Sequence, residues 1–391
     1  MLSSVRFLAQ LFFVSLFLIS CDTINPPTKE VDRDEVKEEV TETSLPLDKI
    51  KLPEGYKIDL FATDVENARS MSISPSGTLF VGTRGDGRVY ALQDSNGDNK
   101  ADKTYTLMKE GNMPNGVAFK DGDLYVAEVN RILKFEDIES KLDNPGEPMV
   151  IYDEYPTESH HGWKYIAFGP DGKLYVPVGA PCNICESDDR VFNSITRINS
   201  DGTGREIVHE GVRNTVGFTW HPETEELWFT DNGRDMLGDD LPACELNRAP
   251  EDKMHFGYPY CHQGDLLDEV YGKNKSCDSY TAPAQNLGAH VAPLGIEFGK
   301  SSMFPSAMST TALIAEHGSW NRSKKSGYRI TMVPINSSME STGYETFAEG
   351  WLDKDKDEAW GRPVDLEFMK DGSMLVSDDF ADVIYRITYK G

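Results

Sequence analysis

The chain is short of positive charge. Its 391 residues carry 39 Lys and Arg against 65 Asp and Glu, a formal net charge of -26 at pH 7. Nucleic acids and anionic lipid headgroups are themselves negative, so this surface repels both and we expect neither as a partner. The acidic surface favours cationic partners or a saline habitat, or it serves solubility alone.

Long apolar runs are scarce as well. Residues 7–19 are apolar but too short to span a bilayer comfortably, and no later segment is long and apolar enough to cross one. Arg6 precedes this run and the letters LISC end it at Cys21, which resembles a bacterial lipobox. We therefore predict a lipoprotein signal peptide over residues 1–20 with lipidation of Cys21; the alternative is an ordinary cleaved signal with a chance cysteine.

Export follows from this N-terminus. The predicted protein lies in the bacterial cell envelope, anchored to a membrane face by lipid and not by a spanning helix. Residues 21–46 are acidic and contain proline, which predicts a disordered tether. Residues 47–391 then form the folded domain.

Cysteine is sparse, with six in the chain. Because an exported protein meets oxidising conditions, we expect the disulfides Cys182–Cys185 and Cys261–Cys277, which leaves Cys244 over. A zinc site needs four ligands at suitable spacing, and His262 beside Cys261 is the single additional candidate ligand, so zinc is not favoured. Haem attachment is not indicated either, because Glu186 stands where a C-x-x-C-H motif needs histidine.

What the chain does contain is a repeat. Six times an apolar strand reaches a tight turn and a second apolar strand follows, and one large apolar residue recurs at an equivalent position of each unit. Turn sequences such as Asp121-Gly122 tolerate hairpin dihedral angles. Strand repeats of this kind predict an all-β fold, a six-bladed β-propeller with function on the loops around a central channel. The recurring residues are Ile73, Phe119, Phe168, Trp220, Phe298 and Phe368.

Several loop residues beside these strands could carry chemistry. His160 and His161 precede a strand, and one of them could act as a general base. Three arginines stand on equivalent loops, and a ring of them would converge on whatever sits over the channel. An Asn-Gly-Arg turn can expose backbone carbonyls to calcium. The arginines are Arg213 (followed by Asn214), Arg322 and Arg362, and the turn is Asn232-Gly233-Arg234.

An acidic loop follows the first repeat unit. Its side-chain oxygens are spaced as in a calcium loop, at Asp94, Asn96, Asp98 and Asp102. Tyr105, however, stands where an EF-hand has its closing glutamate. We predict a possible second calcium at this loop, and the alternative is a solvated acidic turn.

Together these motifs make the chain recognisable. From about Leu52 to the C-terminus it resembles the glucose/sorbosone dehydrogenases, the soluble pyrroloquinoline-quinone (PQQ)-dependent sugar dehydrogenases with a six-bladed propeller, and it looks closest to the sorbosone branch. The motifs that carry the resemblance are HHGWKYI, VRN, the Asn-Gly-Arg turn, HFGYPYCH, AHVAPLG, EHGSWNR and GRPVD.

The resemblance implies a role for each matching position. His161 matches the catalytic base, and Arg213 with Asn214 matches the pair that contacts the quinone. Gly233 and Arg234 match the two residues whose backbone carbonyls hold the cofactor calcium. Arg362 matches a cofactor-carboxylate arginine, and Arg322 lies in the loop of the family's cofactor lysine.

The chain departs from the family at three positions. Ala180 replaces the aspartate that orients the base, which predicts a lower pKa and a less fixed tautomer for His161. Val364 replaces a second arginine, and Cys244 replaces an acidic residue. These changes leave cofactor binding plausible and weaken the case for glucose itself as substrate.

The implied activity is that of a PQQ- and calcium-dependent oxidoreductase. It would oxidise a sugar, polyol or sugar-derived aldehyde and pass electrons to a separate acceptor, a cytochrome or a quinone. Two alternatives share the fold: a calcium-dependent lactonase-like hydrolase, and a non-catalytic propeller that binds carbohydrate or protein.

Overall fold

The computed structural model describes residues 45–391. The predicted signal peptide, the lipidated Cys21 and the tether up to residue 44 lie outside the described residues. Leu45, at the end of the predicted tether, is half-buried and packs against an apolar cluster of the folded domain. The unit Val40–Gly391 contains all the strands described below.

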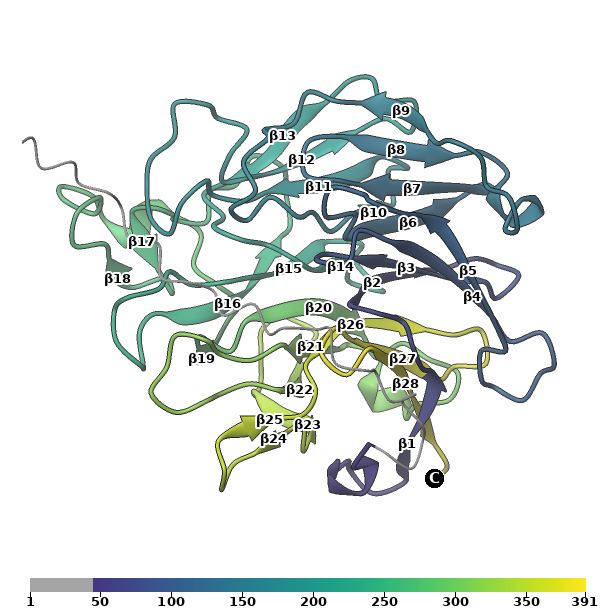
Figure 1. Ribbon diagram of the computed structural model, residues 1–391. Coiled ribbons are helices and arrows are strands. Elements are labelled where there is room, and N and C mark those ends of the chain that lie inside the picture. Colours follow the sequence, from purple (N-terminus) through teal and green to yellow (C-terminus); the bar gives the residue numbers. More distant parts are fainter. Residues whose placement is uncertain (1–44) are drawn as a thin grey trace, which may run out of the picture. The chain divides into compact units, whose positions relative to one another are not determined.

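Residues 45–391 form six sheets of four antiparallel strands, each built mostly from consecutive segments of the chain (Figure 1). The first three sheets follow one another along the chain. They are β2 (Ala68–Ile73), β3 (Leu79–Thr83), β4 (Val89–Gln93) and β5 (Lys103–Met108); β6 (Gly116–Lys120), β7 (Asp123–Ala127), β8 (Ile132–Phe135) and β9 (Met149–Tyr152); and β10 (Ala167–Phe168), β11 (Leu174–Val178), β12 (Ser194–Ile198) and β13 (Glu206–Glu210).

The last three sheets complete the ring. They are β14 (Phe218–Trp220), β15 (Leu227–Asp231), β16 (Ala243–Ala249) and β19 (Gln285–Ala289); β20 (Pro293–Phe298), β21 (Thr311–Glu316), β22 (Arg329–Pro334) and β23 (Glu345–Glu349); and β26 (Pro363–Phe368), β27 (Met374–Asp378), β28 (Val383–Tyr389) and β1 (Tyr56–Ala62).

The remaining elements lie in the connections. Two short ribbons are β17 (Cys261–His262) with β18 (Leu266–Leu267), and β24 (Leu352–Asp353) with β25 (Glu358–Ala359). The helices of the described chain are single 3-10 turns: η1 (Leu47–Lys49), η2 (Ile138–Ser140), η3 (Cys277–Ser279) and η4 (Ser306–Met308). Accordingly, residues 45–391 hold no helix with the length and apolarity that a bilayer crossing needs.

The sixth sheet joins the two ends of the described chain. β1 pairs with β28, with Tyr56 opposite Tyr389 and Leu60 opposite Tyr385. The N-terminal strand therefore supplies the outer strand of a sheet whose other strands are C-terminal (Figure 1). Closing the ring in this way ties the last sheet to the first segment and protects strand edges, as in β-propellers.

Six apolar clusters, one between each pair of neighbouring sheets, form most of the core. The recurring residues predicted from the repeat each pack in a different one of these clusters: Ile73, Phe119, Phe168, Trp220, Phe298 and Phe368. One large side chain per unit thus fills one interface of the ring. The structure confirms the predicted six-bladed β-propeller.

Candidate functional site

The predicted site residues lie at one end of the sheets. In each sheet the first and second strands are antiparallel, so residues just before the first strand and just after the second share an edge. We call the loops at this edge the mouth. His161, Arg213, Asn214 and Arg362 precede first strands, whereas Arg84, Asn232 to Arg234, His317 and Asp379 follow second strands.

His161 is held by a backbone carbonyl. It is buried, its backbone is left-handed (φ 51°), and its Nδ1 lies 2.9 Å from the Ala180 carbonyl oxygen. Because that oxygen can only accept, Nδ1 carries the hydrogen and Nε2 the lone pair. The prediction of a loosely fixed tautomer is therefore wrong: the peptide of Ala180 takes over the orienting contact that its side chain cannot make.

The same peptide joins His161 to Arg213. The Ala180 N–H donates to the Arg213 carbonyl at 2.8 Å, while its carbonyl accepts from His161. The neighbouring Gly179 permits this approach, since a Cβ there would lie 2.6 Å from the His161 Cβ. The imidazole thus has a defined place beside the Arg213 loop.

His161 is neutral at neutral pH. Its pKa lies well below the ordinary histidine value, because burial disfavours the charged ring and the positive Arg213 lies nearby. Within residues 45–391 its Nε2 has no hydrogen-bond partner. A neutral imidazole with a free lone pair can accept a proton from a substrate hydroxyl.

Arg213 and Asn214 are fixed from below by Asp231. The buried Asp231 carboxylate accepts the backbone N–H groups of both residues, at 2.7 and 2.6 Å. Burial raises the pKa of Asp231 to about 6, and these backbone contacts act against the rise. The Asn214 side-chain amide makes no hydrogen bond to the described residues, so it is available at the mouth.

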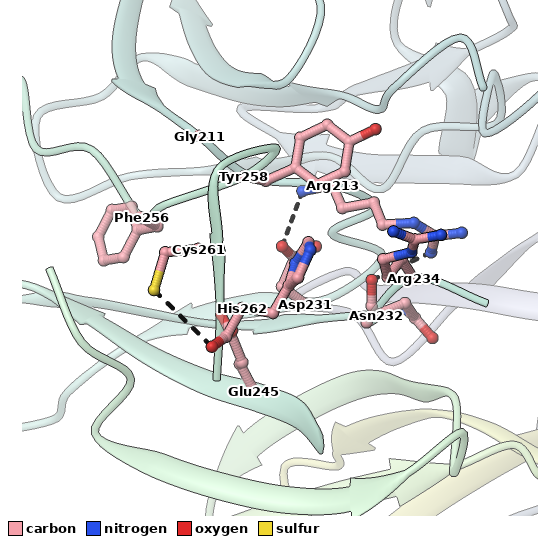
Figure 2. Close-up of a pocket in the computed structure, with 11 residues that line it drawn as sticks. Gly211, Arg213, Asp231, Asn232, Arg234, Glu245, Phe256, Tyr258, Cys261 and His262 are labelled. Atoms are coloured by element: carbon pink, nitrogen blue, oxygen red, sulfur yellow. Dashed lines mark hydrogen bonds between the residues drawn. The ribbon is translucent and has the colours of Figure 1, made fainter. Parts of the chain in front are cut away.

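The Arg213 guanidinium is held from the side. It donates to the carbonyl and side-chain oxygens of Asn183, each at 2.9 Å, to the Asn232 carbonyl at 3.1 Å and to Asp235 at 3.1 Å. Figure 2 shows its side chain extending toward Asn232. These four bonds leave one of five guanidinium hydrogens without a partner in the described chain.

Asn183 lies within the short Cys182–Cys185 loop. The structure joins this pair of cysteines, and likewise Cys261 and Cys277, as disulfides, while Cys244 is a buried free thiol. The Cys182–Cys185 bond closes the loop that presents both Asn183 oxygens to Arg213.

Arg84 and Arg362 give the mouth positive charge that no carboxylate neutralises directly. Arg362 donates to the carbonyls of His317 and Gly318, both at 3.2 Å. Arg84 lies 4.2 Å from the ring centre of Trp163, a cation–π contact. Within residues 45–391 neither guanidinium forms an ion pair with an acidic side chain.

Burial and neighbouring positive groups both lower the pKa of Arg84. Although Arg84 reaches solvent, the surrounding protein and the charges of Arg69 and Arg362 lower its pKa to about 10, with Asp379 acting in the opposite direction. Sequence reasoning missed Arg84. Its place after β3, equivalent to that of Asn232 after β15, was the available signal.

The Asp379 carboxylate contacts one of the neighbouring arginines and His317. Asp379 accepts from the Arg69 guanidinium at 2.5 Å and lies 2.7 Å from His317 Nε2. Burial alone would raise the pKa of Asp379, but His317 and Arg69 hold it far below its usual range. Arg84 and Arg362 therefore stay in excess, and the mouth can bind an anion although the whole chain is strongly acidic.

A small apolar cluster, which we call the apolar floor, adjoins these cations. Val216, Leu294 and Val364 form a small buried cluster against which Trp163 packs. Val364, which replaces the family's second arginine, is part of this floor. A flat molecule with an aromatic body and peripheral carboxylates fits an apolar floor with guanidinium groups around it.

The Asn232-Gly233-Arg234 turn offers two oxygen atoms. The Asn232 side chain donates to the carbonyls of Asn214 (2.9 Å) and Pro293 (3.1 Å), which fixes the start of the turn. No hydrogen bond within the described chain reaches the carbonyl oxygens of Gly233 and Arg234. Carbonyl oxygens without donors are suitable calcium ligands, so the turn fits the role that the resemblance implies.

The Arg234 side chain is anchored away from those carbonyls. It donates to Asp268 at 2.5 Å, and Asp268 also accepts the backbone N–H groups of Val270 and Tyr271 and lies 3.1 Å from His262. The Cys261–Cys277 disulfide closes the loop that carries Asp268. This loop therefore supports the turn.

A cavity of about 10 Å³, room for roughly one water molecule, lies behind the turn (Figure 2). It is too small for a cofactor. Burial, with the neighbouring Asp231 charge, raises the pKa of Glu245 to about 7 in this region. The cavity lining is Gly211, Arg213, Asp231, Asn232, Gly233, Arg234, Glu245, Phe256, Tyr258, Cys261 and His262.

Two groups of predicted residues do not join the site. Arg322 donates from Nη1 to the Asp239 carbonyl, from Nε to the Lys324 carbonyl and from Nη2 to Asp240, so it latches two loops together. His317, earlier on the same loop as Arg322, does lie at the site: its carbonyl oxygen accepts from Arg362. His160 is exposed, and the centre of its ring lies 4.1 Å from that of His161 at an interplanar angle of 56°.

The acidic loop folds on itself. Asp94 accepts from the amides of Gly97 and Asn99, and Asp102 accepts from Ser95. Across residues 45–391 no three His, Cys, Asp or Glu side chains are grouped to hold a metal ion. Asp94, Asn96, Asp98 and Asp102 thus form a self-bonded turn, and the carboxylate cluster expected for a second calcium is missing from it.

Comparison with known proteins identifies a family for this chain. A model of the TrAA12-like family matches residues 50–390. An uncharacterized protein of Borreliella burgdorferi (strain ATCC 35210 / DSM 4680 / CIP 102532 / B31) is 34% identical over 398 residues, covering 96% of each chain.

Solved structures share the fold at lower identity. A calcium structure of the Trichoderma reesei protein of carbohydrate-active enzyme family AA12 is 20% identical (87% and 97% of the chains covered, TM-score 0.76). The holo PQQ domain of Coprinopsis cinerea pyranose dehydrogenase is 17% identical (87% and 97%, TM-score 0.71). The PQQ-bound aldose sugar dehydrogenase of Streptomyces coelicolor is 18% identical (87% and 100%, TM-score 0.62). Because the family model spans nearly the whole described chain, this protein belongs to the TrAA12-like family.

Proposed function

We propose that this protein is a PQQ-dependent oxidoreductase that oxidises a sugar, polyol or sugar-derived aldehyde and passes the electrons to a separate cytochrome or quinone. One observation carries the proposal: Arg84 and Arg362 lack ion-pair partners in the described chain and lie beside the apolar floor, Arg84 through its contact with Trp163 and Arg362 two residues before Val364. This combination suits an aromatic polycarboxylate.

Each residue has a distinct task in this proposal. Arg84, Arg213 and Arg362 bind the carboxylates and quinone oxygens of the cofactor. Gly233 and Arg234 hold calcium through their backbone carbonyls. When bound, PQQ supplies the two-electron redox chemistry.

His161 handles the proton. Its Nε2 accepts the substrate hydroxyl proton, and the Ala180 carbonyl stabilises the resulting imidazolium through Nδ1. Arg213, close to the ring, keeps the resting imidazole neutral and therefore ready to accept. The sorbosone branch remains our proposal for the substrate group, and lipid anchoring at Cys21 in the cell envelope our proposal for location.

The alternatives are less well supported. A calcium-dependent hydrolase of the lactonase type needs side-chain carboxylates and asparagines gathered on one metal, and residues 45–391 contain no group of three His, Cys, Asp or Glu side chains placed to hold one. A purely binding propeller gives no reason for a neutral, backbone-oriented imidazole beside a cationic mouth.

The test uses purified protein with added calcium and PQQ. We expect a saturable change in PQQ absorbance or fluorescence, and dye reduction with at least one member of a panel of sugars, polyols and aldehydes. His161→Ala should retain cofactor binding and lose turnover. Absence of PQQ binding in the presence of calcium, or full turnover by His161→Ala, would refute the proposal.

A further inference from the structure

A second concave surface lies along the rim of the mouth. A groove of about 400 Å³ is lined by Met236, Gly238, Asp239, Trp320, Asn321, Arg322 and Ser323, and we call it the Trp320 groove. Its volume falls in the range of about 300–1,000 Å³ that small-molecule sites occupy. It is far larger than the cavity of about 10 Å³ behind the Asn232-Gly233-Arg234 turn.

Two loops connect the groove to the mouth. One wall begins at Met236, next to Asp235, whose carboxylate accepts from Arg213. The other wall begins two residues after Gly318, whose carbonyl accepts from Arg362. A ligand in the groove would therefore lie on the rim between the two arginine-bearing loops.

The charged side chains of the groove are held by protein groups. Asp239 accepts the backbone N–H of Ser323 at 3.0 Å and its hydroxyl. The Arg322 guanidinium donates to the Asp239 and Lys324 carbonyls and pairs with Asp240, which uses three of its five hydrogens. His290 Nε2 lies 2.9 Å from the Gly238 carbonyl and fixes the first wall from behind. These contacts connect the two walls of the groove.

One flat apolar face and one amide remain free in the groove. Trp320 is 68% exposed and Met236 64%, a high exposure for large apolar side chains beside such a groove. The Asn321 amide lines the groove and makes no hydrogen bond to residues 45–391. An indole face packs on the C–H face of a pyranose ring, and an amide can both donate to and accept from its hydroxyls.

We propose that the Trp320 groove is an outer saccharide subsite, with Trp320 as stacking platform and Asn321 as polar contact. This inference rests on the proposed function, and it deepens it: the substrate is an oligosaccharide or glycoside whose terminal unit reaches His161 while the next unit occupies the groove. The Asp239 carboxylate in the lining disfavours an acidic peptide or a phosphate, and the free Trp320 face and Asn321 amide favour a neutral, hydroxylated ligand.

The experiment compares chain lengths in wild type and Trp320→Ala. The probes are glucose, maltotetraose, cellotetraose and chitotetraose, with dye reduction for kcat and KM and isothermal titration for binding to the calcium- and PQQ-loaded protein. We expect at least one tetrasaccharide to bind more tightly than glucose. Trp320→Ala should weaken that tetrasaccharide about 5-fold and leave glucose and kcat unchanged, since stacked aromatic contacts contribute on the order of 1 kcal/mol.

Controls separate this inference from other outcomes. Val150→Ala removes part of another exposed apolar side chain, 46% accessible, on the outer strand β9 away from the mouth, and should leave every KM unchanged. Equal affinity for glucose and all tetrasaccharides, or a loss in Trp320→Ala seen only with a protein electron acceptor, would overturn the subsite while the proposed oxidoreductase stands. Tetrasaccharide binding that depends on Trp320 in a protein that does not bind PQQ would support the groove and refute the oxidoreductase.

Discussion

Gly179→Ala tests the contact on which the candidate site depends. The added methyl carbon would lie 2.6 Å from the His161 Cβ and 2.9 Å from its carbonyl oxygen, whereas ordinary contacts begin at 3.4 Å. The loop of His161 must therefore move by about 0.8 Å. If the ring takes up the whole movement, the distance from Nδ1 to the Ala180 oxygen grows from 2.9 Å to as much as about 3.7 Å, beyond hydrogen-bond reach.

Two magnitudes follow from this displacement. Overpacking with loss of a buried hydrogen bond should lower the free energy of unfolding by about 2 kcal/mol. A base misplaced by close to 1 Å should reduce kcat/KM by about 100-fold. Urea unfolding and dye-reduction kinetics measure the two effects, and PQQ titration shows whether the cofactor site is retained.

The matched control is Gly343→Ala. Its added carbon would meet only the Glu345 Oε1, at 3.7 Å, so activity should be unchanged and stability should move by less than about 0.5 kcal/mol. Wild-type activity together with wild-type stability in Gly179→Ala would mean that His161 does not approach the Gly179–Ala180 peptide as described.

Three further predictions concern the same site. Arg84→Met should weaken PQQ binding by about 10- to 100-fold with little effect on stability, because it removes a cation that has no ion-pair partner in the described chain; unchanged PQQ affinity would exclude Arg84 from the cofactor site. Asp268→Asn should raise the calcium concentration needed for PQQ binding, because it frees the side chain of Arg234, whereas the exposed Asp265→Asn should not; identical calcium curves would contradict the support of the turn. The acid limb of the kcat/KM profile should have its midpoint below pH 6.5, since protonation removes the His161 lone pair and its pKa is lowered; a midpoint above that value would assign the limb to another group.

Much of the fold was predictable from the sequence for a local reason. Paired apolar strands with turn residues between them specify hairpins, and six copies with one large apolar residue each specify six sheets and six interfaces. Ile73 and Phe368, far apart in the chain, occupy equivalent interfaces because each obeys the same local pattern. The positions of His161, Arg213 and Arg362 at one end followed from the same repeat, since each precedes a first strand.

The tertiary structure decided which groups of those loops actually meet. The sequence shows Ala180 only as a lost carboxylate, whereas its carbonyl direction depends on how the loop packs against Arg213. Arg322 matched a cofactor position, yet its guanidinium donates to Asp239 and Asp240 on a loop of another sheet. Arg84 matched no motif, and its importance rests on the lack of an ion-pair partner within residues 45–391. Such contacts depend on distances between segments remote in sequence, and a residue pattern, which records only order along the chain, determines none of them.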